Sequence, residues 1–163
     1  MGLSKLFFGK PTRHRRKQKR VTRRKIRQNG GQQDISVQFQ GKEAKGNLRA
    51  RSETQLQPII SWSLIPDTLY TVLMWDPDAP EPSWIHLFVV NTPSLNLTQG
   101  QTLLSYTPPT PPSGIHRYYV TVYKQPQKLE MSAPVERGNF RVDEFVAKHQ
   151  LQKIGEKMIR VKA

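Results

Sequence analysis

The chain has 163 residues, with 26 lysines and arginines against 12 aspartates and glutamates, a formal charge of +14 and no cysteine. The length suits one domain with its own core, and the lack of cysteine excludes a disulfide scaffold, a thiolate metal site and a cysteine nucleophile. No apolar run approaches the roughly 18 residues of a membrane span, and the positive charge indicates an anionic partner.

The basic residues are concentrated at the start of the chain. Residues 1–30 hold 12 of the 26 and no acid, which leaves the rest of the chain with 14 basic and 12 acidic residues, a net charge of +2. Between Thr12 and Gln28 only Val21 and Ile26 are apolar, so this segment cannot form a core. We therefore predict an extended basic N-terminal arm at residues 1–31 and a domain at residues 32–163.

The density of arginine and lysine in this arm favours contact with nucleic acid or a nuclear-import signal. A mitochondrial transit peptide and a solvated tail with no specific partner are the alternatives. We expect an intracellular location, in the cytoplasm or nucleus, with a virion or a mitochondrion as further settings. The residues expected to contact nucleic acid or neighbouring proteins of an assembly are Arg13, Arg15, Arg16, Lys17, Lys19, Arg20, Arg23, Arg24, Lys25 and Arg27.

Beyond the arm the sequence is mostly typical of β-strands. Apolar and polar residues alternate at 35–39 and more weakly at 46–51, and the run at 69–75 is continuously apolar, as in a central strand covered on both faces. Further strands are predicted at 58–62, 85–90 and 117–123. One amphipathic helix is predicted from Val142 to Leu151, where Val142, Phe145, Val146 and His149 share a face. The fold class is therefore mainly β, with one short helix near the C-terminus.

Two carboxylates follow the apolar strand at 69–75, in the sequence Asp76-Pro77-Asp78-Ala79-Pro80. Charges this close would raise the pKa of one carboxyl group, whose protonated form could donate a hydrogen bond to an anion. The alternative interpretation is an ordinary capped turn.

A second polar group follows a proline-rich stretch, at residues 114–118. His116 and Tyr118 share one face of the predicted strand, and Gly114 allows a close backbone approach. His86 lies within another strand whose other residues are apolar. Alone it could simply satisfy a hydrogen bond in the core, but together these residues predict a compact polar site.

Three segments, YTVLMWDPDAP at 70–80, WIHLFVVN at 84–91 and PPSGIHRYYVTVY at 111–123, resemble the signature regions of the phosphatidylethanolamine-binding protein family. The resemblance covers roughly residues 34–151. It implies a large central antiparallel sheet, a smaller sheet and an anion pocket at one end, without metal or cofactor. The positions that match pocket residues are Asp76, Asp78, His86, Gly114, His116 and Tyr118. Arg117 is expected to pair with an acid behind the pocket.

Two departures from the family pattern concern the walls of this pocket. Only Glu81, Pro82 and Ser83 separate Pro80 from Trp84, where the family has a longer loop. The segment Gln152–Ala163 is short and basic beside the usual C-terminal segment, so we expect a C-terminally shortened domain with a more open pocket.

Three functions follow as hypotheses. The first is a non-enzymatic module that binds a phosphate or phospholipid headgroup and is tethered by its arm to an assembly, a nucleic acid or a membrane. The alternative is a structural component of a large assembly, either the virion of a large DNA virus or a mitochondrial ribosome, in which the pocket is vestigial. A hydrolase using His116 and Asp76 is the least favoured, because the sequence offers no evident activated nucleophile.

Overall fold

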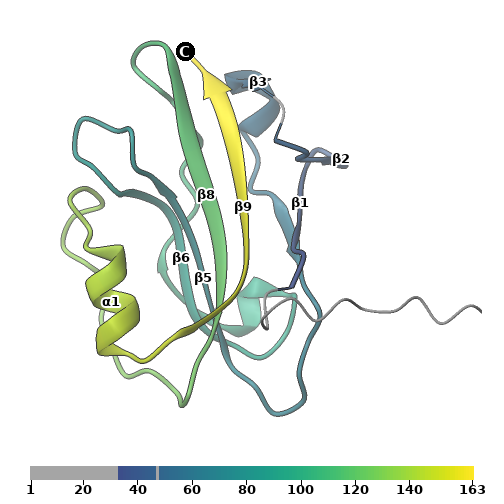
Figure 1. Cartoon of the computed structure of the whole chain (residues 1–163), viewed down its shortest axis with the longest axis vertical. Helices are drawn as coiled ribbons and strands as arrows, with labels where there is room; N and C mark the ends of the chain where they lie inside the picture. The colour runs from purple at the N-terminus through teal and green to yellow at the C-terminus, as the bar shows by residue number, and fades with distance from the viewer. Residues whose placement is uncertain (1–32, 47) are drawn as a thin grey trace, which may run out of the picture.

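A computed structural model describes residues 33–46 and 48–163 of the chain, so the predicted basic arm lies outside the described residues. The described part is mainly β, with two sheets and one short α-helix (Figure 1). Among these residues, no helix is both long and apolar enough to cross a membrane.

The larger sheet has six strands in the order β3-β9-β8-β5-β6-β7. Its strands are β3 (Leu48–Ala50), β5 (Tyr70–Asp76), β6 (Trp84–Thr92), β7 (Gln101–Leu104), β8 (Ile115–Lys124) and β9 (Gln152–Lys162). The apolar strand β5 pairs with β8 and β6 and is buried on both faces, as its continuous run of β-formers predicts.

The smaller sheet is antiparallel, with the order β2-β1-β4. It consists of β1 (Ser36–Phe39), β2 (Lys42–Glu43) and β4 (Ile59–Ser61). The inward side chains of β1, Val37 and Phe39, pack with Tyr70 and Val72 of β5 in the main core. The small sheet therefore covers one face of the large sheet.

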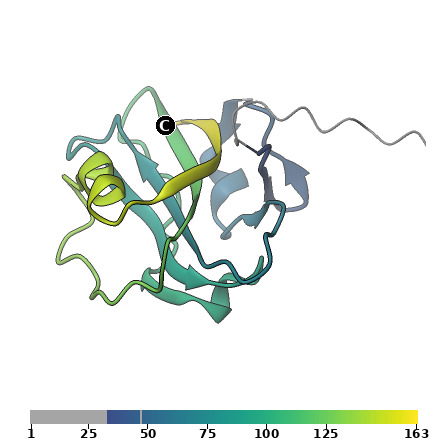
Figure 2. The same ribbon diagram turned by 60° about the horizontal axis from the view of Figure 1, so that its bottom comes forward.

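The helix α1 (Val142–Lys148) covers the opposite face. Its Phe145 packs edge-on against Phe88 of β6, with ring centroids 5.1 Å apart, and both lie in a second core with Leu73. Figure 2 shows α1 and the small sheet on opposite sides of the large one. Two short 3₁₀ helices, Arg51–Thr54 and Leu97–Gln99, complete the elements of the described part.

The structure differs from the sequence-based prediction mainly at the C-terminal end. The helix ends at Lys148 rather than Leu151, and the next residues form β9, an eleven-residue strand that the sequence pattern does not predict. Apolar residues alternate only in the second half of β9, at Ile159 and Val161, because Gly155 lies at a bulge opposite β8. β3 pairs with β9 in parallel, so the sheet is antiparallel everywhere except at this edge.

Candidate functional site

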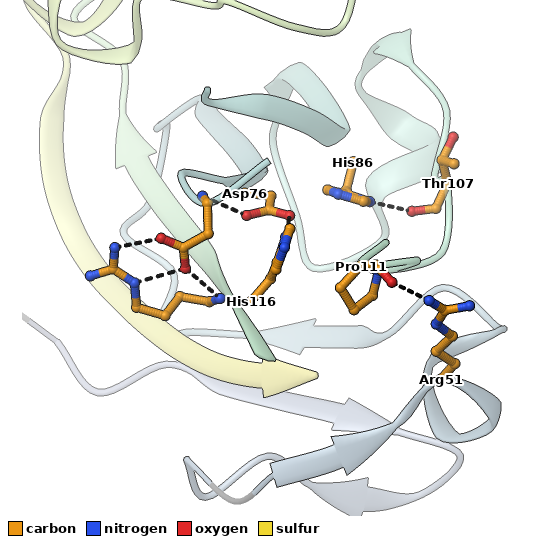
Figure 3. A network of polar contacts seen from close by, with 8 residues as sticks. Arg51, Asp76, His86, Thr107, Pro111 and His116 are labelled. Carbon is orange, nitrogen blue, oxygen red and sulfur yellow. Dashed lines mark hydrogen bonds and ion pairs between the residues drawn. The ribbon is translucent and has the colours of Figure 1, made fainter. Parts of the chain in front are cut away.

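A group of buried polar side chains gathers at one end of the large sheet. In an antiparallel arrangement the end of β5 meets the beginnings of β6 and β8, and this places Asp76, His86 and His116 near one another (Figure 3). Their exposed fractions are only 3%, 4% and 8%. Three predicted site residues that are well separated in the sequence are thus brought together on adjacent strands.

A β-bulge in β6 orients the His86 side chain towards this group. In the pairing of β5 with β6, Met74 is opposite Leu87 and Trp75 is opposite Ile85, so His86 is an extra residue without a partner in the ladder. Regular alternation would place His86 on the same face as Phe88, which packs against α1. The bulge turns His86 to the face that carries Asp76 and His116, a known use of bulges beside functional sites.

Asp76 and His116 form a buried hydrogen-bonded pair. The Nδ1–H group of His116 donates to Oδ2 of Asp76 at 2.8 Å. The other carboxylate oxygen, Oδ1, accepts the backbone N–H of Asp78 at 2.8 Å. Both oxygens of Asp76 therefore have a partner, and the imidazole of His116 is held in one orientation.

His86 is held from the opposite side of the site. Its Nδ1–H group donates to the carbonyl oxygen of Thr107 at 2.7 Å, as Figure 3 shows, and the ring packs against Trp84 and Tyr118 with centroid distances of 4.5 and 5.0 Å. Burial is the main cause that lowers the pKa of His86 to about 4. The ring is therefore neutral at neutral pH, with Nε2 as an acceptor.

A cavity of about 180 Å³ lies between these groups. This is room for several water molecules or one small tetrahedral anion, given that a water needs roughly 10–15 Å³ on the same scale. Its lining residues are Asp76, Ala79, Pro80, Trp84, His86, Thr110, Pro112 and His116. The polar side chains of the lining are thus one carboxylate, two imidazoles, one hydroxyl and one indole.

Asp78 lies outside the lining of this cavity and is bound to Arg117. Its Oδ2 accepts the Arg117 backbone N–H at 2.8 Å and Nε–H at 2.9 Å, and its Oδ1 accepts Nη2–H at 2.6 Å. These bonds lower the pKa of Asp78 to about 2. The pairing of Arg117 with an acid is as the sequence predicts, whereas the idea that neighbouring carboxylates raise a pKa is wrong for Asp78.

Gly114 and Tyr118 support the site without lining the cavity. Gly114 has a φ of 65°, in the left-handed region that favours glycine, and its carbonyl accepts the N–H of Ala163 at 2.9 Å. The Tyr118 ring lies 5.0 Å from that of His86 and 6.5 Å from that of His116. Burial, followed by the charge of Asp76, raises the pKa of Tyr118, so its hydroxyl stays protonated.

Residues outside the predicted set hold the walls of the site. The guanidinium of Arg137 lies over the Trp84 ring at 5.4 Å and donates to the carbonyls of Ile85 and Ser105, each at 3.0 Å. Arg51 donates through Nη2 to the carbonyl of Pro111 in the proline-rich loop (Figure 3). Arg137 lies in neither a periodic pattern nor a motif, and Arg51 only ends the weak alternation at 46–51, so the sequence carries no signal for these roles.

Comparison with known proteins shows which family the chain belongs to. The family model described as phosphatidylethanolamine-binding protein matches residues 30–159. The chain belongs to this family. Within the described residues, no group of three or more His, Cys, Asp or Glu side chains is placed to hold a metal ion.

The chain is 38% identical over 122 residues to the Drosophila melanogaster protein named "Putative odorant-binding protein A5", which covers 66% of this chain and 58% of that protein. It is 35% identical over 131 residues to protein MOTHER of FT and TFL1 homolog 2 of Oryza sativa subsp. japonica, and this match covers 74% of this chain and 71% of that protein. The chain thus spans a little over half the length of the first relative.

The fold is also that of solved structures. The crystal structure of carboxypeptidase Y inhibitor complexed with its cognate proteinase matches with a TM-score of 0.71 and 22% identity, over 80% of this chain and 83% of that chain. At this level of identity the likeness concerns the fold. That protein is an inhibitor in complex with a proteinase, so the fold serves in that case to bind a protein.

Proposed function

We propose that the domain is a non-catalytic binding module that takes a phosphate-type anion into the cavity between His86 and His116. The observation that supports this most is the pair of imidazoles, from β6 and β8, held by separate Nδ1–H hydrogen bonds so that both rings line one cavity. Fixed rings of this kind lose little conformational entropy when a ligand binds. The membership of the family supports the same proposal.

The lining of the cavity favours binding over catalysis. It contains neither serine nor lysine among the described residues, and its one hydroxyl, on Thr110, is not hydrogen-bonded to either imidazole. An activated nucleophile needs its base within hydrogen-bond reach. The Asp76–His116 pair is therefore interpreted as a binding group.

Calorimetric titration with inorganic phosphate tests this function. The full-length protein should bind phosphate, and His116→Ala should weaken binding at least about tenfold, because a charge-assisted hydrogen bond contributes about 1.5–3 kcal/mol. His149→Ala is a matched control, since His149 caps α1 and packs on Phe145, away from the cavity. A wild-type protein that does not bind phosphate, or an equal loss in both variants, would contradict the proposal.

The role of the basic arm is a second, separate part of the proposal. We propose that residues 1–31 tether the domain to an anionic polymer or to neighbouring proteins in an intracellular assembly, on the basis of their 12 basic residues and lack of acids. Because the arm lies outside the described residues, this part rests on the sequence alone.

A further inference from the structure

The cavity proposed to take an anion has no permanent cation in its lining. In the described part of the chain its charged or titratable lining groups are Asp76, His86 and His116 only. The nearby guanidinium groups have other partners. Arg117 binds the carboxylate of Asp78, Arg137 donates to two backbone carbonyls, and Arg51 donates to the carbonyl of Pro111. The charged or titratable groups that a phosphate meets on entry are therefore one carboxylate and two imidazoles, beside the neutral hydroxyl of Thr110.

The hydrogen bonds of these imidazoles decide what they can offer a ligand. The Nδ1–H of His86 is used by the Thr107 carbonyl and that of His116 by the Asp76 carboxylate. In a neutral imidazole the remaining Nε2 has a lone pair and no proton. In that form each ring presents an acceptor beside the carboxylate of Asp76, and the oxygens of a fully ionised phosphate are acceptors too.

A hydrogen bond between such a phosphate and a neutral ring needs one more proton. The proton can come with the ligand, as a P–OH group that donates to Nε2, or from solvent, as an Nε2–H group that donates to a phosphate oxygen. The two descriptions contain the same atoms and the same total charge. In both, the proton also reduces the repulsion between the ligand and Asp76.

We propose, given the phosphate-binding function above, that the cavity binds a phosphate group together with one proton. It therefore prefers a phosphate monoester, which can carry that proton itself, to a phosphate diester, which cannot. The ligand class is the singly protonated monoester group, whether on a free phosphate, a phosphorylated alcohol or a phosphorylated side chain. A phospholipid, whose phosphate is a diester, is a poorer ligand at neutral pH.

The groups around the two rings set the pH range of this effect. Burial disfavours a proton on His86 most strongly and the charge of Arg137 also disfavours one, whereas the hydrogen bond to Thr107 and the charge of Asp76 favour it. Phosphate monoesters lose their second proton at a pKa of about 6. The remaining charged or titratable groups that interact with the site are Tyr118, Asp78, Arg117 and Arg51.

Calorimetric titration of the wild-type full-length chain with methyl phosphate and with dimethyl phosphate, between about pH 6 and about pH 8, tests the inference. The affinity for methyl phosphate should fall by up to about tenfold per pH unit, with nearly one proton taken up at the upper end. The number of protons taken up is obtained by comparing the heat of binding in two buffers of different ionisation enthalpy. Dimethyl phosphate should bind at least about tenfold more weakly at neutral pH.

The outcomes separate the two proposals. Binding of methyl phosphate with an affinity that does not change with pH, or equal binding of the diester, overturns the proton-linked inference and leaves the phosphate site in place. If neither ester nor inorganic phosphate binds at any of these pH values, the phosphate site itself is wrong. Because only the wild-type protein is used, a folding defect cannot produce either result.

Discussion

Replacing Gly155 by alanine should destabilise the fold, because the middle of β9 has no room for a side chain. A Cβ atom at this position would overlap Cγ2 of Ile35 and lie 2.8 Å from the carbonyl oxygen of Gln33. Ile35 is 1% exposed and belongs to the main core, so it cannot move into solvent. The chain before β1 thus crosses β9 in direct contact at the glycine.

The size of the effect follows from two opposing contributions. Overpacking a buried site costs about 1–3 kcal/mol, while alanine reduces the entropy of the unfolded chain and returns about 0.4–1 kcal/mol. We expect the free energy of unfolding to fall by about 1–2 kcal/mol, measured by urea denaturation monitored by tryptophan fluorescence.

A double-mutant cycle with Ile35→Leu shows whether the contact is the cause. Leucine keeps the volume of isoleucine but has no branch at Cβ, so it removes Cγ2 at a cost below about 1.5 kcal/mol. In the Ile35→Leu background, Gly155→Ala should cost about 0.5 kcal/mol or less, a coupling of about 1 kcal/mol. Strict additivity, or no effect of Gly155→Ala, would refute this packing of the chain before β1 on β9.

Three further predictions concern charge, buried polar groups and the arm. Asp78→Asn should lower the free energy of unfolding by about 1 kcal/mol at neutral pH, a value reduced for solvent screening. Because folding lowers the pKa of Asp78 from 3.8 to about 2, this difference between variant and wild type should disappear as the pH falls through that range. A difference in urea denaturation that stays constant with pH would contradict this prediction. Gln125→Ala should lower the free energy of unfolding by about 2–4 kcal/mol, because the buried amide of Gln125 is hydrogen-bonded to Thr71 and Asn91. The control Gln127→Ala, at an exposed position, should change little in the same assay. Equal losses in the two variants would refute the stabilising role of the Gln125 amide. If the arm binds about 10 phosphates of DNA, log K should fall with log salt with a slope near about −9, and a flat response would exclude this partner.

The sequence predicts the fold class and most of the central strands because those strands are encoded locally. The predicted run at 69–75 consists of strand-forming residues that are apolar except for Thr71, and it supplies most of the buried strand β5; the alternation at 35–39 becomes β1. β9 escapes prediction because Gly155 and its bulge interrupt the alternation, and because its partners β3 and β8 are distant in the sequence. The pairing of β9 thus depends on tertiary contacts and is not encoded in its local sequence.

The sequence likewise predicts one part of the site and not another. The sequence predicts that Asp76, His86 and His116 share a site, through motifs that fall at neighbouring strand ends. It does not predict that Asp78 faces Arg117 instead of the cavity, since two adjacent carboxylates look alike in sequence. Nor does it predict the bulge that turns His86 towards the site, because a single extra residue reverses the face that alternation assigns.

The most direct test of a phosphate site between the two histidines is an NMR titration of the imidazole nitrogens. In the protein labelled with ¹⁵N, adding inorganic phosphate should shift the Nε2 resonances of His86 and His116, with smaller changes at Nδ1, which stays bonded to Thr107 and Asp76. The resonances of His149, on α1, should not move. Unchanged Nε2 resonances at saturating phosphate, or equal shifts at His86, His116 and His149, would contradict the account.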